Sequence, residues 1–141
     1  MSGPSRSGTR SKWTVPRLKR ELKDLLRDRT RWVVIEKELH DTNCRAYCRW
    51  NGNGPLGIVV DPNQDGRVPL VIHECLHFLL REVFDGFDTL IEEVVVVSLT
   101  QHLMAEWLER SPRLYGWFKS RIAEQLALTR ETIEEAEEAS R

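Results

Sequence analysis

Residues 71–80 form an apolar run that carries three titratable side chains in the pattern His-Glu-x-x-His. In a helix, His73 and His77 lie one turn apart on the same face, which brings two imidazoles close enough to share one Zn²⁺ ion. Glu74 points roughly a quarter-turn away, where a carboxylate can accept a proton without binding the metal. The apolar neighbours predict a buried helix over residues 69–84, in which unpaired polar groups are costly. A metal would satisfy these groups; the alternative is a core helix whose histidines bond to the backbone.

A hydrolytic zinc site needs a third protein ligand and one open position for water. A second helix is predicted from about residue 88 to residue 109, and it can fold back antiparallel against the first. Glu92 and Glu93 in its first turns could then face the histidine pair. The apolar stripe that continues from Glu92 favours this residue, although Glu92 is also the expected glutamate of a capping box beginning at Thr89. Glu93 is the next candidate, and His102 or an aspartate is the remaining alternative.

The rest of the chain predicts a small α+β domain. Leu18, Leu22, Leu25 and Leu26 recur at helical spacing and predict an amphipathic helix over residues 16–29. Residues 32–35 read as a strand, and residues 44–60 read as a hairpin around an Asn-Gly-Asn-Gly turn. A further helix is expected over residues 114–128, extended by an acidic segment. The predicted fold is thus a small antiparallel sheet packed against the motif helix and further C-terminal helices.

Domain organisation follows from length and charge. We expect one domain over residues 13–130, a disordered basic tail at 1–12 and an acidic C-terminal tail at 131–141. The net charge is -1, which predicts no general affinity for nucleic acid. The basic start and acidic end of the chain read as solvated faces, with a nucleic-acid contact as the minority interpretation.

Cysteine usage and hydropathy predict a cytoplasmic protein. The three cysteines are an odd number and do not indicate a disulfide framework. No apolar run is long enough to span a membrane, and no signal peptide opens the chain.

Two further patterns are interpreted as structural. Cys44 and Cys48 lie four residues apart but lack the two other ligands of a metal site, so both are expected to be core thiols. Residues 61–66 match the first half of a calcium-binding loop, yet Ile72 stands where such a loop needs a glutamate. We therefore expect a simple turn there.

The strand pair, the loop after it, the His73-Glu74-Cys75-Leu76-His77 motif and the following Glu-Glu helix together resemble minimal zincin metallopeptidase domains. The resemblance is to the gluzincin type found in bacteria and their phages, and it covers about residues 30–110. It implies one Zn²⁺ per chain, held by His73, His77 and either Glu92 or Glu93, with Glu74 as general base. It also implies an antiparallel sheet whose edge strand pairs with an extended peptide or protein substrate.

The working hypothesis is a zinc metallopeptidase in which Glu74 takes a proton from a metal-activated water and returns it to the leaving amine. Tyr115 and His102 are candidates for stabilising the oxyanion, by residue type only. Two other classes stay open. One is a non-catalytic module for binding or host interaction that zinc staples together, and the other is a DNA-associated zinc protease anchored by the basic start of the chain.

Overall fold

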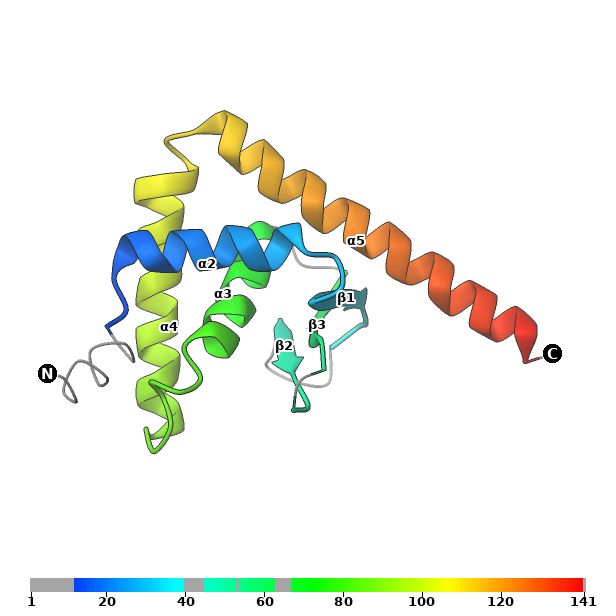
Figure 1. Ribbon diagram of the computed structural model, residues 1–141, viewed down its shortest axis with the longest axis horizontal. Helices are drawn as coiled ribbons and strands as arrows, with labels where there is room; N and C mark the ends of the chain where they lie inside the picture. Colours follow the sequence, from blue (N-terminus) through cyan, green and yellow to red (C-terminus); the bar gives the residue numbers. More distant parts are fainter. Residues whose placement is uncertain (1–11, 40–44, 53, 63–66, 141) are drawn as a thin grey trace, which may run out of the picture.

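The computed structural model describes residues 12–39, 45–52, 54–62 and 67–140. Its fold is α+β, as expected, with helices gathered around a three-stranded sheet (Figure 1). Most of the tail expected at residues 1–12 lies outside the described residues. In chain order the elements are α2 (Val15–Arg27), β1 (Trp32–Glu36), β2 (Ala46–Arg49), β3 (Leu56–Val60), α3 (Arg67–Leu79), α4 (Thr89–Leu103), the π-helical turn η1 (Met104–Leu108) and α5 (Pro112–Ala139).

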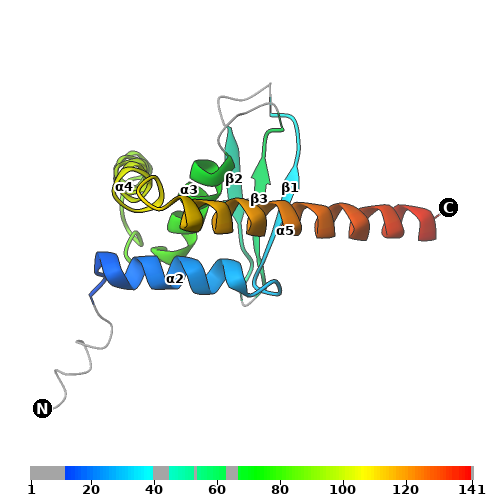
Figure 2. The ribbon, with the colours of Figure 1, turned by 90° about the horizontal axis from the view of Figure 1, so that it is seen from above.

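The sheet has the order β1-β3-β2 and is mixed rather than wholly antiparallel. The expected hairpin is present, because β2 and β3 pair antiparallel with Cys48 opposite Ile58. Its turn is closed by a bond from Gly54 N–H to Asn51 C=O at 2.9 Å and uses Gly52 at a φ of 56°, a backbone conformation that glycine adopts readily. The first strand, β1, pairs parallel with β3 instead. This arrangement leaves β2 as the edge strand beside α3 (Figure 2).

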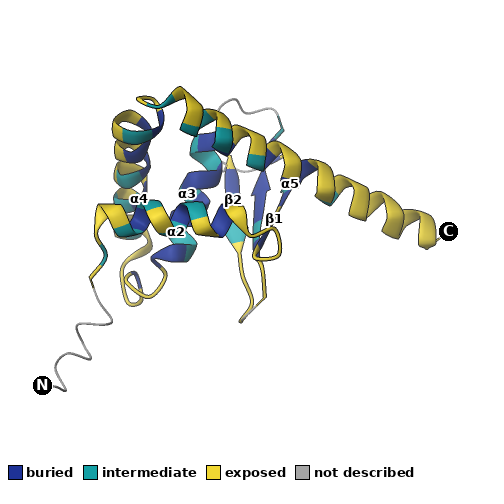
Figure 3. Cartoon of the chain, turned by 45° about the horizontal axis from the view of Figure 1, so that its top comes forward, coloured by how far each residue is buried: buried dark blue, intermediate teal, exposed yellow. Residues whose placement is uncertain are grey.

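Helix α3 lies at the centre of the fold and packs against β2, β3, α2, α4 and α5 (Figures 1 and 3). Its core-facing side chains are fully buried, including Val71, Ile72, Cys75 and Leu76. The helix ends at Leu79, earlier than the expected residue 84. The backbone winds more tightly after Leu79 than in an α-helix, because Arg81 N–H donates to Phe78 C=O, only three residues back.

Helix α4 begins where the chain has turned back toward α3. Gly86 makes this reversal at a φ of 86°, and Asp88 caps the new helix by accepting a bond from Leu90 N–H at 2.8 Å. The four consecutive valines are helical, as expected. The predicted capping box at Thr89 is wrong, because Asp88 is the cap residue. The side chain of Glu92 is therefore free to make another contact.

Helices α2 and α5 brace the sheet and α3. The leucines predicted for α2 are buried, and Thr14 caps the helix by accepting a bond from Arg17 N–H at 3.2 Å. Helix α5 is 28 residues long and includes most of the segment that we set apart as an acidic tail. Its exposed last turns project beyond the rest of the fold (Figures 1 and 3). No helix in the described part of the chain combines the length and apolar character that a membrane crossing requires.

Gln125 of α5 ties this helix to the segment between α2 and β1. Its side chain is 3% exposed, and its amide donates to the carbonyls of Arg29 and Trp32 at 3.2 and 2.5 Å. We expect Gln125→Ala to lower the free energy of unfolding by about 1–3 kcal/mol, because two carbonyls lose their donor. Chemical denaturation measures the change, with the exposed Glu131→Ala as control. A loss no larger than that of the control would contradict this role for Gln125.

Candidate metal centre

The two histidines of the motif lie side by side on α3, facing α4. Their ring centroids are 5.0 Å apart, as the one-turn spacing predicts, and their side chains are 19% and 17% exposed for His73 and His77. Cys75 between them points the other way, into the core, and is fully buried. The motif helix thus divides its side chains between an apolar face that holds the fold together and a polar face available for chemistry.

Glu93 of α4 completes a cluster of three ligand atoms with the histidines. Its Oε1 lies 2.5 Å from His73 Nε2 and 3.4 Å from His77 Nε2. One ligand atom from each residue lies within 4.8 Å of the other two. Within the described part of the chain, no other group of His, Cys, Asp or Glu residues brings three ligand atoms this close together. In a tetrahedral zinc site, with bonds of about 2.0–2.1 Å, neighbouring ligand atoms lie roughly 3.3 Å apart.

The donor set fits zinc, and one of the two separations to Glu93 also fits without adjustment. The separation between His77 and Glu93 is close to the tetrahedral value, whereas that between His73 and Glu93 is shorter, so a small side-chain movement would accommodate an ion. Two imidazole nitrogens and one carboxylate oxygen also form a donor set found in hydrolytic zinc sites, and they leave a fourth position for water. The residues present are therefore chemically suited to Zn²⁺.

Glu92 contacts the other ring nitrogen of His77. Its Oε2 lies 2.6 Å from His77 Nδ1, and Glu92 is outside the three-residue cluster. In the tautomer with the proton on Nδ1, this nitrogen donates to Glu92 and the lone pair of Nε2 is directed away from Glu92. The apolar stripe on α4 favoured Glu92 as third ligand, whereas the observed geometry favours Glu93 and makes Glu92 a residue that orients His77.

Glu74 is the most buried acid of the site. Its side chain is 6% exposed, and the thiol of Cys48 on β2 donates a hydrogen bond to its carboxylate. Burial raises the pKa of Glu74 above its ordinary value, and the bond from Cys48 opposes this shift without cancelling it. Burial also raises the pKa of the Cys48 thiol, so the thiol keeps its proton and remains a donor. The sequence predicted a core thiol at Cys48 and missed this contact.

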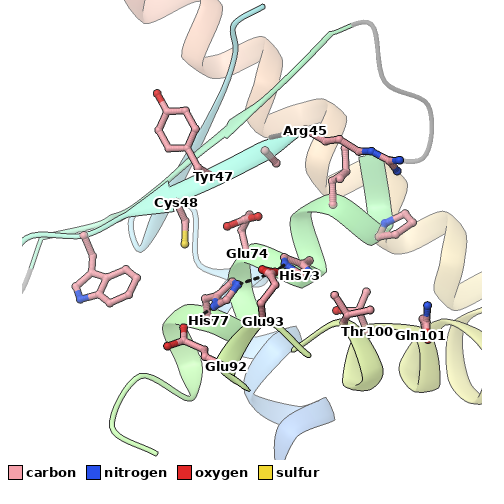
Figure 4. A pocket seen from close by; sticks show the side chains of 15 residues that line it. Arg45, Tyr47, Cys48, His73, Glu74, His77, Glu92, Glu93, Thr100 and Gln101 are labelled. Atoms are coloured by element: carbon pink, nitrogen blue, oxygen red, sulfur yellow. Dashed lines mark hydrogen bonds and ion pairs between the residues drawn. The ribbon is translucent and has the colours of Figure 1, made fainter. Parts of the chain in front are cut away.

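A pocket of about 740 Å³ opens in front of the cluster, between β2, α3 and α4. Arg45, which directly precedes β2, and the consecutive β2 residues 46–48 all line it. Because side chains alternate along a strand, consecutive lining residues indicate that the backbone edge of β2 borders the pocket. In Figure 4, Cys48 points toward Glu74 while Tyr47 points away. The pocket is further lined by Trp50, Pro69, Leu70, Val97, Thr100 and Gln101, none of which the sequence had singled out.

The other candidates lie elsewhere or are not described. His102 is exposed near the end of α4 and is not among the described residues that line this pocket. Tyr115 lies on α5 and lines a second, smaller pocket together with Arg67 and Lys119. Neither residue is therefore placed to stabilise an oxyanion at the His73–His77 cluster. The predictions for Cys44 and for residues 63–66 of the calcium-like loop fall outside the described residues.

Comparison with known proteins yields no match to this chain among protein-family models, curated proteins or solved structures.

The two adjacent glutamates should differ in their effect on metal affinity. We expect Glu93→Gln to cause the larger loss of zinc affinity, because it removes a charged ligand atom. Glu92→Gln should weaken binding by about 10–100-fold, as expected for a residue that orients a ligand. Competition with a chromogenic zinc chelator measures both changes.

The exposed Glu82→Gln, in the turn between α3 and α4, is the matched control and should leave the zinc affinity unchanged. A larger loss in Glu92→Gln than in Glu93→Gln would reverse the two assignments.

Proposed function

We propose that this protein is a zinc-dependent metallopeptidase. The observation that carries the proposal is the cluster of His73, His77 and Glu93, with the buried carboxylate of Glu74 beside it in one pocket. A structural zinc site needs only the residues that bind the ion, so a further carboxylate such as Glu74, which is not one of the three ligands, would have no role there. An open pocket with such an acid is what metal-assisted hydrolysis requires.

In the proposed reaction, His73, His77 and Glu93 hold the metal and Glu74 carries the proton. When bound, zinc supplies Lewis-acid chemistry, lowering the pKa of a water molecule to about 7 and polarising a carbonyl oxygen. Glu74 accepts the proton of the attacking water and returns it to the nitrogen of the leaving amine.

The two neighbouring contacts hold these groups in place. The thiol of Cys48 donates to Glu74 from the β2 side of the pocket, and Glu92 holds His77 from the α4 side. Both contacts come from regular secondary structure, which fixes side chains more accurately than loops do.

An extended peptide is the substrate that fits the shape of the pocket. β2 pairs with β3 along one side, and its other edge borders the pocket beside Glu74. A peptide that adds to this edge gains main-chain hydrogen bonds along its length and brings a carbonyl group past the cluster. This mode of binding supports a peptidase rather than a hydrolase of small molecules.

Substitution of the proton carrier should separate metal binding from catalysis. We expect Glu74→Gln to retain zinc and to lower peptide hydrolysis by at least about 100-fold, because the amide cannot carry the proton. His77→Ala should lose both zinc and activity. Elemental analysis and cleavage of an unfolded peptide library measure the two properties, with Glu82→Gln as control.

Hydrolysis by Glu74→Gln at the wild-type rate would contradict this mechanism. Wild-type protein that binds zinc tightly and cleaves no peptide would instead indicate the alternative class, a binding module stapled by zinc.

A further inference from the structure

Trp50 is an exposed aromatic side chain at the border of the pocket. It follows directly after β2, is 39% exposed and lines the same pocket as His77 and Glu74. Leaving so large an apolar surface in water is unfavourable, and tryptophan is enriched where proteins bind their partners. The proposed reaction gives this residue no role.

The ring of Trp50 is held on the α3 side of the sheet. It meets Phe78 edge-on, with centroids 5.4 Å apart and an angle of 70° between the rings. Phe78 follows His77 directly on α3 and is itself covered by the guanidinium of Arg81, 4.2 Å from its centroid. Phe78 therefore holds the ring of Trp50 in place, and this contact puts Trp50 at the His77 end of the pocket.

The position of Trp50 along β2 relates it to the reacting bond. Cys48, which contacts Glu74, and Trp50 are two positions apart in the sequence, and both line the pocket. At about 3.3 Å per residue of extended chain, Trp50 lies roughly 7 Å from Cys48, just beyond the end of β2. An extended peptide beside β2 has the same repeat, so the side chain that reaches Trp50 belongs to a residue about two positions from the cleaved bond.

Tyr47 and Trp50 are the large aromatic side chains among the described residues that line the pocket. Arg45, Thr100 and Gln101 also line the pocket, and Tyr47 points away from Glu74 (Figure 4). Among the described lining residues, Trp50 is thus the aromatic residue left to contact a substrate in this pocket. If the peptide pairs antiparallel with β2, as β3 does, its N-terminal part lies at the Trp50 end.

We infer that Trp50 is a specificity-determining residue, which binds a large apolar, preferably aromatic, side chain on the N-terminal side of the cleaved bond. The inference rests on the proposed peptidase function. It follows from the contact of Trp50 with Phe78, which is next to His77 in the sequence, and from the position of Trp50 directly after the edge strand in the lining of the pocket. Substrates are accordingly extended peptide segments with an aromatic residue about two positions before the cleavage point.

Binding can be tested without turnover. We expect zinc-loaded Glu74→Gln, labelled with ¹⁵N at its indole groups, to shift the Trp50 resonance when a peptide containing phenylalanine is added. The matched peptide with alanine at that position should cause a much smaller shift. The Trp50 resonance is identified by its loss in Trp50→Phe, a variant that keeps an aromatic ring and should keep the preference.

Cleavage gives the second measurement. Profiling of a peptide library with wild-type protein should show aromatic residues enriched before the cleaved bond. Trp50→Ala should lower kcat/KM for such peptides by about 10–100-fold and leave alanine-containing peptides nearly unchanged. The control is Phe87→Ala, which removes a 46% exposed aromatic ring that is paired edge-on with Phe84 and is not among the residues lining the pocket.

The outcomes separate the inference from the proposed function. Cleavage without aromatic preference, together with no selective shift of Trp50, overturns the inference and leaves the peptidase standing. A selective shift of Trp50 without cleavage by the wild type overturns the peptidase and supports Trp50 as a binding residue. Equal zinc content in Trp50→Ala and wild type shows that the variant has kept its metal centre.

Discussion

The structure depends on how a central helix accommodates polar side chains. Helix α3 packs against the sheet and three other helices, yet carries two histidines and a glutamate in one turn of its length. Burying such groups is unfavourable unless each finds a partner. The partners come from the two flanking elements, because α4 supplies Glu92 and Glu93 and β2 supplies Cys48. The chain reversal between α3 and α4 is therefore as important to the site as the motif itself.

Two adjacent glutamates on α4 serve one histidine in different ways. Successive residues of a helix point about 100° apart, so Glu92 and Glu93 reach opposite nitrogens of His77. Glu93 lies among the ligand atoms, and Glu92 lies behind the ring. Asp88 caps α4 in place of the predicted capping box at Thr89. The side chain of Glu92 is therefore not needed to cap the helix and can contact His77 instead. The cluster is consequently held from two helices, while the edge of β2 borders the pocket.

Features that depend on local periodicity could be predicted from the sequence, whereas those that depend on packing between distant elements could not. The helical spacing of His73 and His77 and the turn signal at Gly52 each act over a few residues, and the structure agrees with both. The parallel pairing of β1 with β3 joins strands that are distant in the sequence, which local patterns do not report. The choice between Glu92 and Glu93 depends on the rotation of α4 about its axis relative to α3, and the contact of Cys48 with Glu74 depends on how β2 packs on α3.

We propose that His73, His77 and Glu93 bind one zinc ion. The most direct test is elemental analysis of the purified, untagged protein, with wild type measured beside His73→Ala. We expect about one zinc per chain in the wild type and its loss in the variant, because removal of one of three protein ligands leaves too few to hold the ion. Absence of zinc from the wild type, even after refolding in its presence, would show that these residues hold no metal and that the motif is only a polar face of a core helix.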